Sequence, residues 1–74
     1  MKLSALPKNQ KALIIKINLN KEAKERLHNL GLIKGVRICL VRSSPLKWPK
    51  IYSVLNTLVA LRQNTADAIE IKND

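Results

Sequence analysis

The chain has 74 residues, and 46% of them are hydrophobic although only 3% are aromatic. This length predicts one domain, residues 1–74, with a small core of leucine, isoleucine, valine and alanine. No apolar stretch is long enough to span a bilayer and no secretory leader pattern is present, so we expect a cytoplasmic protein that does not insert into the membrane.

The formal net charge is +9, from 14 Lys and Arg residues against 5 Asp and Glu residues, and no run of five or six cations occurs. A charge of this size is typical of proteins that bind nucleic acid, an anionic membrane surface or an acidic protein. It is also typical of a solvated surface that keeps a small apolar domain in solution. The charge alone does not decide between these interpretations.

The first predicted strand covers residues 12–17, whose sequence is ALIIKI. Its β-branched residues favour a strand, but Ile14 and Ile15 break the alternation of apolar and polar positions. A bulge at this point would let Ile14 and Ile17 both face the core.

A helix is predicted to begin at Lys21, because the side chain of Asn20 can accept a hydrogen bond from a free backbone N–H of its first turn. Ala23, Leu27 and Leu30 recur on one face of this helix. We expect that face to lie against the core.

The two glycines of the chain lie four positions apart, directly after this helix. Gly31 fits the left-handed position that ends a helix, because it has no Cβ to clash. Gly35 fits the third position of a type II turn over residues 33–36, which also requires a positive φ. Together they predict a change from helix to strand within four residues.

Three further strands are predicted, at residues 36–42, 50–55 and 58–62. In the first of them Val36, Ile38 and Leu40 alternate on the side that we expect to face the core. Residues 56–57 are predicted to form a two-residue turn between the other two strands.

The loop at residues 43–49, SSPLKWP, is expected to be stiff and to lie outside the sheet, because Pro45 and Pro49 lack a backbone donor. Near the C-terminus, Asn64 is predicted to cap one helical turn that contains Ala66 and Ala68. Ile69 and Ile71 then indicate a closing strand. Five short strands and one helix favour a small, closed, mostly antiparallel barrel.

The sequence offers few groups for catalysis or metal binding. It has one histidine, His28, and one cysteine, Cys39, and its acidic residues show no paired spacing suited to acid–base catalysis. We interpret His28 as a partly exposed residue of the last helical turn rather than a metal ligand, and Cys39 as a surface thiol rather than a nucleophile. We therefore expect no enzyme activity, no cofactor and no bound metal.

Several short motifs, taken together, resemble the ferrous iron transport protein A (FeoA) family over about residues 3–71. The matching residues are Leu30, Gly31 and Leu32 after the helix, Gly35 before the second strand, Pro45, Leu46 and Pro49 in the loop, and then Leu61, Arg62 and Ala66. The resemblance implies a mostly β, SH3-like antiparallel barrel with one short α-helix after the first strand. It also implies a cytoplasmic protein without catalysis of its own, which assists the membrane ferrous-iron transporter FeoB through the cytoplasmic G domain and is recruited to the inner membrane by that partner.

The chain departs from the family pattern at a few turn positions. Asn9 and Asn56 stand where members often carry glycine, and asparagine tolerates a left-handed backbone better than other non-glycine residues do. Lys47 and Trp48 replace a Gly–Asp pair that is common in the loop, which gives the loop a basic and aromatic character.

An apolar surface on the second hairpin is the candidate for partner binding or self-association. Alternation places Tyr52 and Val54 toward the core, so Ile51, Leu55 and Leu58 should project from the other face of the hairpin. With the loop tryptophan added, the candidate residues are Trp48, Ile51, Leu55 and Leu58. A register shifted by one residue would instead bury these side chains and expose Tyr52.

A basic barrel that binds nucleic acid is the alternative function. Barrels of that kind stack bases on aromatic side chains, and this chain offers only Trp48 and Tyr52. Nucleic acid is therefore the less favoured partner.

Overall fold

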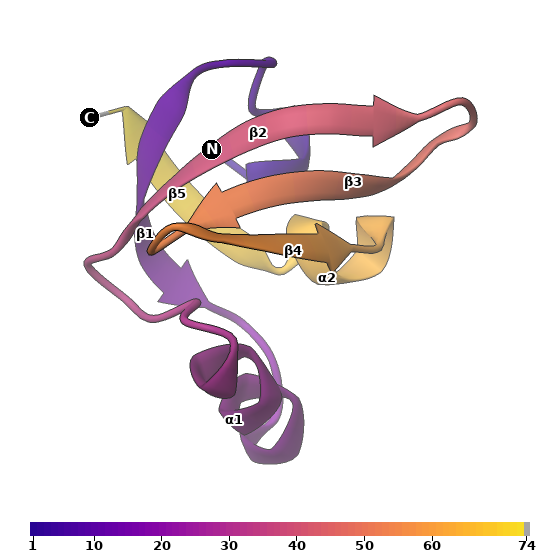
Figure 1. Cartoon of the computed structure of the whole chain (residues 1–74). Helices are drawn as coiled ribbons and strands as arrows, with labels where there is room; N and C mark the ends of the chain where they lie inside the picture. The colour runs from indigo at the N-terminus through magenta and orange to yellow at the C-terminus, as the bar shows by residue number, and fades with distance from the viewer. Residues whose placement is uncertain (74) are drawn as a thin grey trace.

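The computed structural model describes residues 1–73 (Figure 1). The elements, in chain order, are a 3-10 turn at Leu3–Ala5, then β1 (Lys11–Ile17), α1 (Lys21–Asn29), β2 (Arg37–Ser44), β3 (Lys47–Val54), β4 (Thr57–Leu61), α2 (Gln63–Asp67) and β5 (Ile69–Asn73). Within this part of the chain, no helix is long and apolar enough to cross a membrane.

The strands form one antiparallel sheet in the order β4-β3-β2-β1-β5. The short helix α2 connects the two edge strands and packs against β3, β5 and the N-terminal 3-10 turn, so it covers the gap between the edges. Figure 1 shows the strongly curved sheet with α2 behind β4 and with α1 projecting at one end. The predicted fold class, a mostly β antiparallel barrel with a short helix after the first strand, is confirmed.

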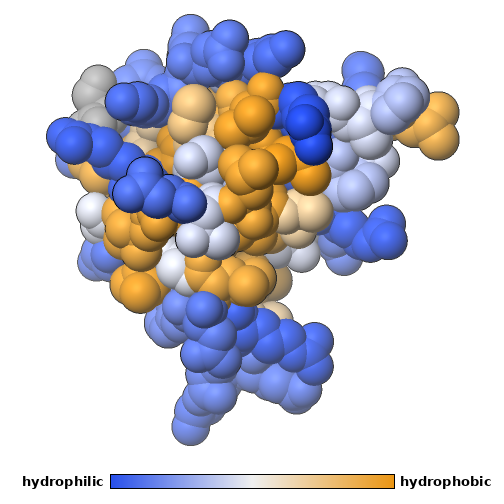
Figure 2. Space-filling model, viewed as in Figure 1, coloured by the Kyte–Doolittle hydropathy of each residue, from blue (hydrophilic) through white to orange (hydrophobic). Residues whose placement is uncertain are grey.

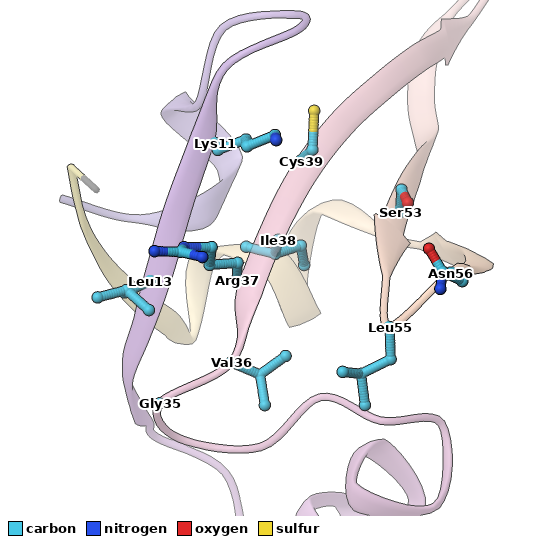
Figure 3. A pocket seen from close by; sticks show the side chains of 10 residues that line it. All are labelled: Lys11, Leu13, Gly35, Val36, Arg37, Ile38, Cys39, Ser53, Leu55 and Asn56. Carbon is cyan, nitrogen blue, oxygen red and sulfur yellow. The ribbon is translucent and has the colours of Figure 1, made fainter.

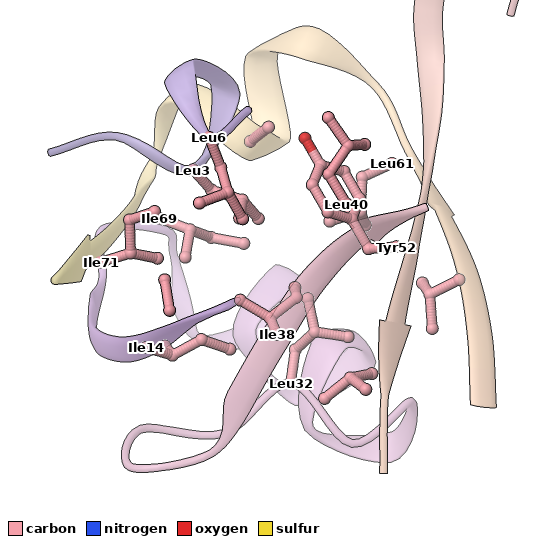
Figure 4. Packing of buried hydrophobic residues seen from close by; sticks show 14 of the residues in the cluster. Leu3, Leu6, Ile14, Leu32, Ile38, Leu40, Tyr52, Leu61, Ile69 and Ile71 are labelled. Carbon is pink, nitrogen blue, oxygen red and sulfur yellow. The ribbon is translucent and has the colours of Figure 1, made fainter. Parts of the chain in front are cut away.

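The core is built almost entirely from aliphatic side chains, as the composition predicts, and Tyr52 is its largest fully buried side chain (Figure 4). Among the described residues, no polar or charged residue other than this tyrosine is buried. The predicted inward face of α1 is only partly correct: Leu27 is buried, but Ala23 is half-buried and Leu30 is 47% exposed. The reason is that α1 projects from one end of the barrel, and Leu27 is its only buried residue (Figure 1).

The bulge in β1 is confirmed. The pairing with β5 shifts between Ile14 and Lys16, which leaves Ile15 outside the ladder and partly exposed. Ile14 and Ile17 are both buried as a result. The bulge thus resolves the conflict in the apolar pattern of this strand.

The end of α1 is confirmed as a glycine cap. Gly31 has a φ of +95°, its N–H donates to His28 O at 3.0 Å, and the Leu32 N–H donates to Leu27 O at 2.9 Å. This pair of bonds is a Schellman motif, and it brings Leu32 into the core beside Leu27. Asn20 caps the other end, where its Oδ1 accepts from the Ala23 N–H at 2.8 Å.

Gly35 also adopts the predicted conformation. Its φ is +93°, and the Val36 N–H donates to Ile33 O at 3.1 Å across the turn. The Gly35 N–H donates to Ile14 O at 2.7 Å, which ties the turn to β1. The chain thus enters β2 in register with the first strand.

The prediction of a loop at residues 43–49 is wrong. The strands β2 and β3 continue through most of this segment, and the chain reverses at Pro45 and Leu46. Ser43 pairs with Lys50 and Ser44 with Lys47, so two residues of β3 bulge out of the ladder, the second of them Pro49. A proline in a bulge costs no ladder hydrogen bond, which explains how this segment can remain paired.

The next turn lies one residue earlier than predicted. Val54 pairs with Thr57, so the turn residues are Leu55 and Asn56 rather than residues 56–57. Their φ angles are +50° and +62°, the combination that a type I′ hairpin turn requires. In this register Tyr52 pairs with Val59, and both side chains lie in the core.

The second helix begins two residues earlier than predicted. Arg62 occupies the N-cap position of α2 and makes no side-chain cap hydrogen bond. Asn64 lies inside the first turn, where its Oδ1 accepts from the Thr65 N–H at 2.9 Å. The expected burial of Ile69 and Ile71 in the closing strand β5 is confirmed.

Candidate partner-binding surface

A groove of about 600 Å³ crosses the outer face of the sheet from β1 to the turn after β3 (Figure 3). Apart from the buried core residue Ile38, it is formed by outward strand positions and by the turns before β2 and after β3. The lining residues are Lys11 and Leu13 of β1, Gly35 and Val36 of the turn, Arg37, Ile38 and Cys39 of β2, and Ser53, Leu55 and Asn56 at the end of β3.

One end of the groove is apolar. The side chains of Val36 and Leu55 lie opposite each other there (Figure 3), and Leu55 is 62% exposed. Leu55 also lies over Gly31: a Cβ built on that glycine would be 3.2 Å from Leu55 Cδ1. The glycine cap of α1 therefore also makes room for this exposed leucine.

The other end of the groove is basic. Lys11 pairs with Cys39 and Leu13 with Arg37, so the two cations lie on neighbouring strands (Figure 3). None of the described residues that line the groove is acidic. The sequence has no Asp or Glu between Glu25 and Asp67, so the strands β2 to β4 carry only positive charge. Such a groove attracts carboxylate groups of a partner.

The four candidate partner-binding residues do not form one patch. Leu55 and Leu58 are both exposed, at 62% and 61%, but Leu58 pairs with Ser53 and Leu55 lies in the turn, so they are not direct cross-strand neighbours. Ile51 is half-buried and pairs with Ala60. Trp48 lies near the opposite end of β3 from Leu55 and packs against the core. The expectation that Trp48 extends the leucine surface is therefore wrong, because β3 is an extended strand rather than a folded loop.

The motif residues of the family pattern hold turns and core positions. Leu32 and Leu61 are buried, whereas Leu30 is the exposed C-cap of α1 and Arg62 is the N-cap of α2. The remaining members define backbone geometry: Gly31 and Gly35 in left-handed turns, Pro45 in the turn of the β2–β3 hairpin and Pro49 in its bulge.

Neither large aromatic ring is open for stacking. Tyr52 is fully buried, and the ammonium of Lys50 lies 4.4 Å from the centroid of the half-buried Trp48 ring. The Tyr52 hydroxyl is buried without a hydrogen-bond partner among the described residues. Burial, and then the negative charge of Asp67, raise the pKa of Tyr52 to about 12.

His28 and Cys39 lie on different elements, at the end of α1 and in β2. His28 is exposed, as expected for a last-turn residue. Cys39 is half-buried, and its Sγ lies 3.7 Å from Leu40 O. Across residues 1–73 no three His, Cys, Asp or Glu side chains lie close enough together to hold a metal ion.

The basic part of the groove was not identified from the sequence. Lys11, Leu13, Arg37 and Cys39 occupy the outward positions of strands whose inward positions define the core. The alternation of β1 and β2 contains this information. The outward residues form a groove only when the pairing of β1 with β2 places Lys11 beside Cys39 and Leu13 beside Arg37.

Comparison with known proteins assigns the chain to a family. The family model named FeoA domain matches residues 1–73. The chain is 40% identical over 72 residues to a Campylobacter jejuni protein named "Putative Fe(2+) transport protein A", with 96% of each chain covered. It is 29% identical to part of a Porphyromonas gingivalis protein named "Fe(2+) transport protein A/Fe(2+) transporter FeoB fusion protein", of which it spans only 8%.

Solved structures agree with this assignment. The iron(II) transport protein A of Clostridium thermocellum is 33% identical and superposes with a TM-score of 0.94, covering 99% of this chain and 45% of that one. A Stenotrophomonas maltophilia FeoA, described as an SH3 domain protein complexed with zinc, is 29% identical with a TM-score of 0.78, covering 97% and 89% of the two chains. The described fold is therefore an SH3-like barrel, and the chain belongs to the FeoA family, which is linked to ferrous iron transport.

Proposed function

We propose that this chain is a cytoplasmic accessory protein of bacterial ferrous-iron uptake, which acts as one domain and binds the cytoplasmic region of the transporter FeoB. The observation that carries the proposal is the fusion relative, in which a segment similar to this chain and a FeoB transporter share one polypeptide. In the fusion protein, the covalent chain holds the two parts together. Separate chains with the same two functions need a binding surface to associate.

The groove and its exposed leucine are the best candidate for that surface. Leu55 is largely exposed although it occupies a left-handed turn position that leucine rarely adopts. Strained residues of this kind cluster at sites of function. The adjoining Lys11 and Arg37 supply positive charge, so we expect a partner segment that carries both an apolar side chain and carboxylates. Leu58 is a second exposed leucine, on β4 opposite Ser53 of the groove lining.

The test is retention of a purified FeoB cytoplasmic region by the full chain. We expect the double variant Leu55→Lys, Leu58→Lys to lose binding, because both substitutions replace exposed apolar contact area with charge. Circular dichroism should show an unchanged fold, since both side chains are exposed. The matched control is Leu46→Lys, which makes the same chemical change at a leucine that is 89% exposed at the other end of β3. It should bind normally.

Two outcomes would overturn the proposal. A folded double variant that binds the transporter region as tightly as the native chain would remove the assigned surface. Tight, salt-dependent binding of oligonucleotides by the native chain at low salt, without binding of the transporter region, would establish the nucleic-acid function instead. Gel filtration of the native chain and the double variant would show whether the same surface supports self-association.

A further inference from the structure

The β2–β3 hairpin carries an isolated apolar side chain at its tip. The hairpin extends beyond the body of the barrel and reverses at Pro45 and Leu46 (Figure 1). Leu46 is 89% exposed, more than any other large hydrophobic side chain of the described residues. In Figure 2 a hydrophobic residue stands alone at the end of this projection, apart from the apolar surface of the barrel.

Positive charge surrounds this leucine. Residues 42–50, which we call the tip, contain Arg42, Lys47 and Lys50 and no acidic residue. Arg42 pairs with Ile51, and Lys47 and Lys50 pair with the two serines of β2, so all three cations belong to the outer half of the hairpin. Arg42 and Lys47 are exposed, and Lys50 is half-buried.

The tip is held in place by contacts at its base. Ser44 Oγ donates to Trp48 O at 2.7 Å, and Lys50 Nζ donates to Ser4 O at 3.2 Å. Trp48 packs against the core below the turn. These contacts fix the hairpin to the barrel, so Leu46 is presented outward by an ordered scaffold.

We propose that the tip adsorbs to the surface of a bilayer that contains anionic lipids, with Leu46 inserted at the headgroup level and the tip cations near the lipid phosphates. An apolar side chain flanked by Lys and Arg is the arrangement that binds such interfaces, and tryptophan favours the same depth. No spanning segment is needed. An acidic protein would satisfy the charges of the tip, but a lone exposed leucine on a projecting turn offers it very little contact area.

The proposal does not depend on transporter binding. Leu46 and Leu55 lie just beyond opposite ends of the eight-residue strand β3, which separates them by roughly 25 Å at a strand rise of about 3.3 Å per residue. A chain that is adsorbed through the tip therefore keeps its groove free. Adsorption would hold the groove at a fixed height above the membrane, on the side where a membrane protein exposes its cytoplasmic parts.

The experiment uses the full chain with phosphatidylcholine vesicles, with and without phosphatidylglycerol. Sedimentation should show binding to the anionic vesicles, little binding to the neutral ones, and release when salt is raised well above about 0.15 M. Because Trp48 is the only tryptophan, its fluorescence reports on the tip directly. We expect a blue shift with anionic vesicles and quenching by lipids brominated near the headgroup.

Matched variants separate the tip from the rest of the surface. Leu46→Ser should bind anionic vesicles about tenfold more weakly, the loss expected when one leucine no longer inserts. Leu58→Ser removes an equally apolar, 61% exposed side chain from β4 and should bind as the native chain does. Arg42→Gln with Lys47→Gln should weaken binding, whereas Lys21→Gln with Lys24→Gln on α1 makes the same change in net charge far from the tip and should have a smaller effect.

The outcomes discriminate clearly. Native binding by Leu46→Ser, or equal losses from the two pairs of charge variants, would overturn the proposal in favour of unspecific attraction by the net charge. Absence of vesicle binding, or displacement from vesicles by a stoichiometric amount of oligonucleotide, would also overturn it. Leu46→Ser should still bind the transporter region, and the Leu55, Leu58 variant should still bind vesicles, so either proposal can fail without the other.

Discussion

Several non-glycine residues of this protein adopt the left-handed backbone conformation in turns. Asn9 and Asn56, which replace glycines common in the family, have φ angles of +66° and +62°, so the expectation that asparagine tolerates these turns is confirmed. Lys47, which also stands where glycine is common, has a φ of +75°. Leu55, at +50°, has no side-chain property that favours this conformation.

Substitutions at the two glycines allow the cost of backbone strain to be separated from the cost of a steric contact with Leu55. Gly31→Ala should lower the free energy of unfolding by about 1–2 kcal/mol, because a Cβ at φ +95° is strained and would also meet Leu55 Cδ1 at 3.2 Å. Gly35→Ala has a similar φ but no atom within 4 Å of the Cβ, so it should cost only the strain. Urea unfolding of both variants would measure the difference. In a Leu55→Ala background the two costs should become equal; a persistent difference would contradict the assigned contact.

The buried Tyr52 hydroxyl should contribute little to stability at neutral pH. Its oxygen has no hydrogen-bond partner among the described residues, so Tyr52→Phe should leave the free energy of unfolding unchanged or raise it by up to about 1 kcal/mol. Chemical denaturation at pH 7 would check this. A clear loss of stability would mean that the hydroxyl has a partner in solution.

The same residue gives a prediction for alkaline pH. Its pKa rises from 10.0 to about 12 on folding, so the folded state favours the neutral phenol. The titration of Tyr52 therefore leaves the free energy of unfolding unchanged below pH 10 and lowers it as the pH rises from 10 through the folded pKa. Native protein should therefore lose more stability between pH 10 and 12 than Tyr52→Phe does. Denaturation experiments that show an equal loss of stability for the two proteins over this pH range would contradict the pKa shift.

At the scale of elements, the two α-helices differ in how their first turns are satisfied. Asn20 caps α1 with a 2.8 Å hydrogen bond, whereas Arg62 at the equivalent position of α2 has no cap hydrogen bond. The backbone of Arg62 is extended there, at φ −83° and ψ 162°, which is the geometry that a capping side chain needs. A side chain that caps α2 at this position would therefore stabilise the protein relative to arginine.

Opposite effects are expected from substitutions at the two caps. Asn20→Ala should lower the free energy of unfolding by about 1 kcal/mol, and Arg62→Asn should raise it by about 0.5–1 kcal/mol. Thermal and urea unfolding of both variants would measure these changes. Destabilisation by Arg62→Asn would show that the arginine side chain makes a stabilising contact that outweighs a cap.

At the scale of the whole molecule, the charges are unevenly distributed. The described acidic residues lie on α1, α2 and β5, whereas β2, β3 and β4 form a continuous meander without a carboxylate. The tip belongs to this acid-free part of the chain, and so does the groove apart from Lys11 and Leu13 of β1. A partner or membrane with negative charge would therefore orient the whole molecule before contact.

A metal ion should not stabilise the isolated chain. His28 and Cys39 lie on separate elements, and within residues 1–73 the side chains do not assemble a metal-binding cluster. Equimolar Fe²⁺ or Zn²⁺ should therefore leave the melting temperature unchanged, because only a ligand that binds the folded state raises it. A clear upward shift would contradict this. His28→Ala and Cys39→Ser would then show whether two copies share a site through these residues.

The sequence by itself determined the features that depend on local chemistry. The Asn20 cap, the left-handed Gly31 and Gly35, the bulge after Ile14 and the inward face of β3 all follow from residue type and spacing. Each is set by a steric or hydrogen-bonding requirement that extends over only a few residues. The family motifs added the barrel and the link to iron transport.

Only the tertiary structure decided where segments distant in the chain meet. Two prolines suggested a loop at residues 43–49, yet pairing with β2 keeps Pro49 inside a strand as a bulge. The pairing of Tyr52 with Val59 places the next turn on Leu55 and Asn56, and the pairing of β1 with β2 creates the basic groove. Register and groove shape depend on cross-strand partners, and a local pattern cannot specify them because the partner's position is set by the packing of the whole core.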